Sequence, residues 1–256
     1  MSSGSHAERL LQSLGVTEPK EIDLEAIAFH LNARVRFRPI DGCEARIIGF
    51  GDNAIITVKD NSGLRRQRFS IAHELGHWLY HRGQTLACRA EDIRPRDKIN
   101  PERVADGYAA DLILPRYLLQ PFARKFPKLT TKVIREIAET FQTSLTATAI
   151  RLVELGHSPA MLICHGSKRQ KWKWFTRGPD VPSKWFPKDQ LDADSFAFDI
   201  LYGAGNEDIT PRKIGADAWF DRWEAGKYEI CEQTFRTSDL EVVTVITFTN
   251  EKMLEG

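Results

Sequence analysis

The chain has 256 residues, 42% of them hydrophobic, so it is long enough to bury a substantial core in one large domain or two modest ones. Its 36 basic and 35 acidic residues leave a net charge of +1, which excludes a molecule-wide field that would attract nucleic acid or a membrane. The four cysteines are scattered, and no leader or long apolar run occurs, so we expect a cytoplasmic protein with reduced thiols and no membrane partner.

The N-terminal part predicts two helices followed by a small sheet. Apolar residues recur at helical spacing over residues 7–14, and Asp23 can cap a second helix that begins at Leu24. Three alternating segments then follow, ARVRFRP, ARIIGF and NAIITV, separated by the turn-prone sequences DG and GDN. We predict a small antiparallel sheet in which the last segment, from Asn53 to Val58, is an edge strand.

The next segment, FSIAHELGHWLYH at residues 69–81, has the pattern of a metal-binding helix. Residues four apart on a helix lie about 40° apart around its axis, so His73 and His77 can reach one ion at roughly 2.0–2.1 Å. Glu74 points to the flank of that site, where its carboxylate can take a proton from a metal-bound water. The alternative is an amphipathic helix that carries two surface histidines.

A catalytic zinc site needs a third protein ligand, and Glu102 at the start of the next predicted helix is our candidate. Asp106 lies four residues further on the same face, where it can accept the outward N–H of a ligand histidine. Both acids could instead only stabilise the helix N-terminus. The competing ligands lie in the preceding loop and are Glu91, Asp92 and Asp97. His81 would lie a full turn beyond the ion.

The two helices together resemble a known family. FSIAHELGH at residues 69–77 and ERVADGYAADLILP at residues 102–115 are similar to the two diagnostic helices of the ImmA/IrrE metallopeptidases. The order of a helix and a short sheet ahead of the histidines also matches, so the resemblance extends over about residues 8–155. It implies a zincin-like domain with zinc ligands His73, His77 and Glu102, and with Glu74 as the catalytic base.

The resemblance also implies a substrate, because family members cleave a helix-turn-helix repressor and so relieve repression of stress-response or mobile-element genes. Zn²⁺ is the expected cofactor, although a His₂Glu site can also accept Mn²⁺ or another divalent ion. From strand order alone, the predicted edge strand could bind the substrate backbone through the residues Asn53, Ala54, Ile55, Ile56 and Thr57. The oxyanion donor stays open among Tyr80, His81, Tyr108 and Tyr117.

The rest of the chain is less informative. Residues 131–155 resemble a helix-turn-helix, but the segment is not strongly basic, so we expect helices packed on the peptidase domain and not direct nucleic-acid binding. From Ala160 onward four segments have strand character, and SFAFDILY has helical character. We expect this part to be regulatory or to dock the substrate.

These observations predict an α+β protein of three parts. The expected parts are a zincin-like peptidase domain over residues 7–130, a helical segment over 131–158 and a strand-rich C-terminal domain over 159–256. The predicted function is that of a zinc endopeptidase acting on a repressor. Two rival hypotheses are a catalytically silent metal-binding partner protein and a DNA-binding regulator that uses residues 131–155.

Overall fold

The computed structural model describes residues 4–80, 100–168, 171–203, 205–207 and 210–255. Within these ranges the chain forms eight α-helices and two β-sheets, so the predicted α+β class is confirmed. No helix in the described ranges is both long and apolar enough to cross a membrane.

By their internal contacts the residues group into two compact units. The first comprises residues 1–119 and 139–144, and the second comprises 120–138 and 145–256. The division into three parts that the sequence suggested stays a prediction, as do the roles assigned to those parts.

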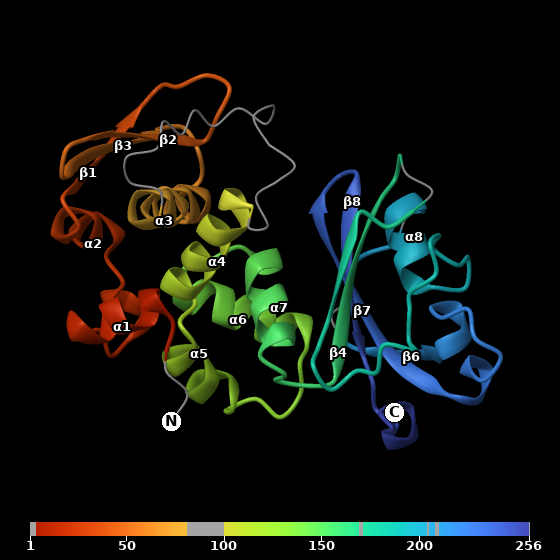
Figure 1. Cartoon of the computed structure of the whole chain (residues 1–256). Helices are drawn as coiled ribbons and strands as arrows, with labels where there is room; N and C mark the ends of the chain where they lie inside the picture. The colour runs from red at the N-terminus through yellow and green to blue at the C-terminus, as the bar shows by residue number, and fades with distance from the viewer. Residues whose placement is uncertain (1–3, 81–99, 169–170, 204, 208–209, 256) are drawn as a thin grey trace. The chain divides into compact units, whose positions relative to one another are not determined.

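The first unit contains a three-stranded sheet with helices packed against it (Figure 1). The strands are β1 (Ala33–Arg38), β2 (Ala45–Phe50) and β3 (Asn53–Lys59). The helices are α1 (His6–Ser13), α2 (Leu24–His30), α3 (Leu64–Tyr80) and α4 (Pro101–Ile113), and α5 (Arg116–Ala123) begins in this unit. Asp23 caps α2 as predicted, because its carboxylate accepts the N–H groups of Glu25 and Ala26.

The sheet corrects two predictions. Its strand order is β1-β3-β2, and β1 pairs with β3 in parallel, so the sheet is mixed and not antiparallel. β3 is therefore the central strand and not an edge. Ala54 N–H donates to the Asn32 carbonyl on one side, and Lys59 N–H donates to the Glu44 carbonyl on the other.

The proposal that a substrate adds alongside β3 is consequently wrong, because both sides of that strand are already paired within the sheet. The five residues predicted to bind the substrate backbone, Asn53 to Thr57, lie on this central strand, with Ala54, Ile56 and Thr57 buried. Their backbone groups are hydrogen-bonded to β1 and β2 and are not available to another chain.

The second unit is built on a five-stranded antiparallel sheet with the order β5-β4-β8-β7-β6. Its strands are β4 (Ala160–Gly166), β5 (Trp174–Arg177), β6 (Arg212–Gly215), β7 (Glu229–Ser238) and β8 (Glu241–Thr247). Its helices include α7 (Leu145–Glu154) and α8 (Phe196–Tyr202), and α6 (Thr131–Phe141) begins in it.

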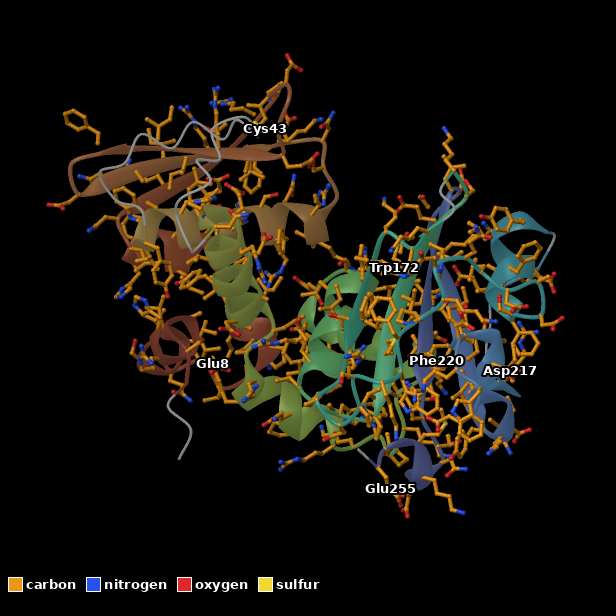
Figure 2. All side chains as sticks on the ribbon, turned by 45° about the vertical axis from the view of Figure 1, so that its right-hand side comes forward. Glu8, Cys43, Trp172, Asp217, Phe220 and Glu255 are labelled. Carbon is orange, nitrogen blue, oxygen red and sulfur yellow. The ribbon has the colours of Figure 1, made fainter. Side chains whose placement is uncertain are left out.

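Both faces of this second sheet are covered at β4, because every residue of that strand is buried. Figure 1 shows α7 and α8 on opposite faces of the sheet. On the α8 side a cluster that includes Trp185, Trp219 and Phe220 forms the core, with Trp172 packed at its border. The side chains around Trp172 and Phe220 fill this unit densely (Figure 2).

Candidate metal centre

Helix α3 is fixed against the sheet by one apolar face, which determines where its histidines point. Ile71, Leu75 and Trp78 recur at spacings of four and three residues and are buried. The Trp78 indole N–H donates to the Leu31 carbonyl over 2.8 Å. A Cβ atom on Gly49 of β2 would lie 2.7 Å from the Trp78 ring, so the strand can approach the helix this closely only with glycine there.

Helix α4 packs tightly against α3, and this packing brings Glu102 to the histidines. Asn100 caps α4 by accepting the Glu102 N–H over 3.0 Å, and Pro101 occupies the first helical position. A Cβ atom on Gly76 would lie 2.8 Å from Ala105 Cα. The two helix backbones therefore meet at Gly76 with no room for a side chain.

The two histidines and the glutamate converge with their metal-binding atoms. His73 Nε2 lies 3.3 Å from one carboxylate oxygen of Glu102, and His77 Nε2 lies 3.4 Å from the other. The two Nε2 atoms are 3.0 Å apart. All candidate ligand atoms lie within 4.8 Å of one another. Metal–ligand bonds of roughly 2.0–2.1 Å at a tetrahedral angle place donor atoms about 3.3 Å apart, so this triad fits a divalent metal ion.

Asp106 lies where the sequence predicted it. Its carboxylate is 2.9 Å from His73 Nδ1, so that nitrogen donates to Asp106 and Nε2 keeps its lone pair toward the triad. Burial alone would lower the pKa of His73, but Asp106, with the charges of Glu74 and Glu102, raises it above its usual value. The local charge thus favours a cation at this position.

Glu74 is a buried carboxyl group beside the triad, with only 3% of its surface exposed. Its Oε2 atom has no hydrogen-bonding partner among the described residues. Burial raises the pKa of Glu74 to about 7, while His73 opposes this rise and Glu102 adds to it. A carboxyl group in such surroundings can exchange a proton near neutral pH.

A cavity of about 270 Å³ adjoins the triad, and part of its wall was not expected from the sequence. His73, Glu74 and Glu102 line it as the motif predicted. The further lining residues are Glu44, Ala45, Arg66, Phe69 and Ser70. Three of these, Arg66, Phe69 and Ser70, precede His73 by seven, four and three residues, so helical spacing alone could have indicated them.

The three tyrosines considered as oxyanion donors are not among the described lining residues of this cavity. Tyr117 donates its hydroxyl to the Val16 carbonyl over 2.8 Å, and neither Tyr80 nor Tyr108 lines the cavity wall. Arg66 and Ser70 do line it and carry N–H and O–H donors. His81 and the competing ligands Glu91, Asp92 and Asp97 lie outside the described residues.

Comparison with known proteins is consistent with this geometry. Residues 28–153 match the family model of the IrrE N-terminal-like domain, a peptidase family. Residues 28–153 therefore belong to the ImmA/IrrE family. The matched range contains both α3 and α4, so the resemblance drawn from their sequences is confirmed. The family assignment supports a peptidase-type enzyme.

Among solved structures, a Mycobacterium tuberculosis transcriptional regulator is similar to this chain, with a TM-score of 0.63 and 14% sequence identity. The alignment covers 94% of this chain and 74% of the regulator. At this identity the likeness concerns the fold alone. A comparison with curated proteins found no match.

Proposed function

We propose that this member of the ImmA/IrrE family is a metal-dependent endopeptidase that cleaves a helix-turn-helix repressor and so relieves repression. The observation that carries the catalytic part is the convergence of His73, His77 and Glu102 within 4.8 Å, beside the buried carboxyl group of Glu74. The repressor as substrate, and its link to stress response or mobile elements, rests on the family resemblance.

In this proposal His73, His77 and Glu102 hold the ion, Zn²⁺ in the first instance, and Asp106 orients His73. When bound, the ion would polarise the scissile carbonyl and acidify water. Glu74 then accepts a proton from the attacking water and returns it to the leaving amine, a role worth about 10²–10⁴ in rate. Its burial in the cavity wall excludes bulk water from the carboxyl group.

We further propose that the substrate backbone binds alongside β2, which pairs only with β3 within the described residues. Hydrogen-bonded and non-hydrogen-bonded pairs alternate in an antiparallel ladder, and Lys59 N–H donates to Glu44. The N–H groups of Ala45, Ile47 and Gly49 therefore point away from β3. Ala45 also lines the cavity next to His73, so a chain added there would pass the triad.

The first experiment measures metal content by elemental mass spectrometry on purified wild type and on the variants His73→Ala, Glu102→Ala and Glu74→Gln. We expect one zinc per chain in wild type and in Glu74→Gln, and loss of zinc in both ligand variants. Absence of metal from all four proteins, purified without chelators, would contradict the proposed metal site. It would favour the alternative that α3 is a helix that carries two histidines and binds no ion.

The second experiment searches for the substrate. New protein N-termini are compared between cells that produce wild type and cells that produce Glu74→Gln at equal amounts. We expect a cleaved DNA-binding protein with wild type alone. Equal N-termini in both cells, with zinc present in both proteins, would favour a catalytically silent metal-binding partner instead.

A further inference from the structure

A second cavity lies in the C-terminal unit, between the end of β4 and helix α8. Its volume is about 460 Å³, within the range of small-molecule sites. His165, the next-to-last residue of β4, lies in its wall, followed by Ser167 and Lys168 in the turn after that strand. Leu191, Phe198 and Tyr202 form an apolar side of the wall.

His165 is the unusual member of this wall. Only 4% of its surface is exposed, and neither ring nitrogen has a hydrogen-bonding partner of normal geometry in the described chain. Burial lowers the pKa of His165 to about 4, against a smaller opposing effect of the Asp189 backbone. The Asp189 carbonyl accepts the Trp172 N–H over 3.0 Å and has a second lone pair that can take one imidazole N–H. A neutral imidazole has one donor and one acceptor nitrogen, so the Asp189 carbonyl can satisfy at most the donor, and the acceptor nitrogen is held in the wall without a partner among the described residues.

Buried polar groups in folded proteins are hydrogen-bonded, so an imidazole left in this state indicates a missing partner. Its neighbours in the described chain supply no donor for the acceptor nitrogen. The Trp219 ring lies 6.0 Å away between ring centroids, and the opposite residue on β8 is Val242. The partner must therefore come from the cavity that the side chain borders.

The remaining wall indicates what kind of molecule would fit. Lys168 is the only charged residue among the described lining residues, and it is exposed at the surface, whereas His165 is buried. The rings of Phe198 and Tyr202 lie 5.0 Å apart on consecutive turns of α8 and offer apolar surface in the same wall. The wall thus combines an exposed cation, apolar surface and a buried hydrogen-bonding imidazole.

We propose that this cavity binds a small organic acid, with its carboxylate at Lys168, its apolar body against Leu191 and Phe198, and a hydroxyl or similar group at His165. This site is separate from the metal triad and does not depend on peptidase activity. It gives the C-terminal unit a binding function of its own.

The test uses the full chain and three matched probes: 4-hydroxyphenylacetate, phenylacetate and tyramine. Phenylacetate lacks the hydroxyl group, and tyramine replaces the carboxylate end by an amine. In titrations followed by ligand-observed NMR, we expect the hydroxy acid to bind with a dissociation constant of about 1 mM or lower, and each of the other two about tenfold more weakly. Equal binding of tyramine, or no saturation by the hydroxy acid, would overturn the proposal.

Two variants test which residue contacts which end of the ligand. Lys168→Glu changes an exposed residue and should weaken binding of the hydroxy acid at least about tenfold. The control Lys213→Glu lies on β6, outside the wall of this cavity, and should leave that binding unchanged. His165→Leu should abolish the preference for the hydroxy acid over phenylacetate. If Lys168→Glu binds the hydroxy acid as wild type does, the proposal fails, and this outcome can be read even where His165→Leu proves unstable.

Discussion

At the scale of single residues, the contact between His73 and Asp106 decides which imidazole nitrogen is available to an ion. Because Nδ1 donates to Asp106 over 2.9 Å, Nε2 carries the lone pair that faces Glu102. We predict that Asp106→Ala lowers zinc affinity by about 10–100-fold while the fold is kept. Competition with a chromophoric chelator measures this change directly.

The control for this prediction is Asp111→Ala, which removes a carboxylate further along the same helix, α4. It should leave zinc affinity within about twofold of wild type. This variant removes one negative charge from α4 but keeps the hydrogen bond between His73 and Asp106. Equal losses in the two variants would show that Asp106 acts only through its charge.

His165 supports a prediction about pH. Its pKa is lowered from 6.5 to about 4 by burial, so the unfolded chain binds more protons than the folded one between these values. The stability contribution is therefore complete above pH 6.5 and is lost as the pH falls toward 4. When the pH falls from 7 to 5, the titration of this residue alone should lower the free energy of unfolding by about 2 kcal/mol.

Denaturant unfolding at several pH values tests this. His165→Leu should reduce the loss of stability between pH 7 and pH 5 by about 2 kcal/mol relative to wild type, whereas His30→Leu, at an exposed position, should not. Burial also lowers the pKa of His157, so both variants keep the part of the pH dependence that comes from this residue. An unchanged slope in His165→Leu would mean that folding does not shift the pKa of His165.

The candidate metal triad could be predicted from the sequence because the positions of its two histidines depend on local geometry. Two histidines four residues apart share a helix face whatever the helix packs against. The contact with Glu102 needed a second helix, and the motif match supplied it. Glu44 and Ala45 could not be predicted as cavity residues, because only the packing of β2 beside α3 places them there.

At the scale of elements, the close contact of α3 and α4 at Gly76 holds Glu102 over the histidines. In Gly76→Ala the new Cβ would lie 2.8 Å from Ala105 Cα, so α4 must move away. Overpacking costs about 1–3 kcal/mol, which exceeds the roughly 1 kcal/mol that alanine gains in a helix. We predict a lower melting temperature and weaker zinc binding, since Glu102 lies one turn before the displaced residue.

Gly107 on α4 provides the matched control, because a Cβ there meets no atom within 4 Å. Gly107→Ala should stabilise the chain by up to about 1 kcal/mol and leave zinc affinity unchanged. Calorimetric melting and zinc competition on the two variants separate helix propensity from helix contact. A Gly76→Ala protein that behaves like Gly107→Ala would show that the helices are not tightly held.

The order of strands is the element-scale feature that sequence reasoning got wrong. Three alternating segments in a row suggest consecutive antiparallel pairing, but β1 joins the far side of the β2–β3 hairpin. A signal was present in the composition. β1 and β2 carry four arginines between them, Arg34, Arg36, Arg38 and Arg46, whereas β3 reads NAIITVK. Charged side chains are typical of edge strands, and an almost continuous apolar run is typical of a central one.

At the scale of the whole molecule, the helices before Gly156 belong partly to the C-terminal unit. Thr131 at the start of α6 donates its backbone N–H to the Gln233 side chain on β7 over 2.9 Å, and that side chain donates back to the Thr131 hydroxyl over 3.0 Å. Helix α7 packs on β4 and β5 with Ala149, Leu152 and Val153 fully buried. Sequence alone could not indicate this, because the apolar pattern of α6 and α7 predicts packed helices but not the unit on which they pack.

This packing predicts how a truncation after Gly156 behaves. The fragment would keep α7 but lose β4 and β5, so Leu152 and Val153 would face water. Each newly exposed side chain of this size costs about 1.5–3 kcal/mol, and contiguous apolar surface promotes association. We expect the fragment to bind a hydrophobic dye and to elute as oligomers in gel filtration, whereas the full chain should do neither. A monomeric fragment that melts cooperatively and retains one zinc would show instead that residues up to 156 fold by themselves, and the role of the C-terminal part could then be tested by its removal.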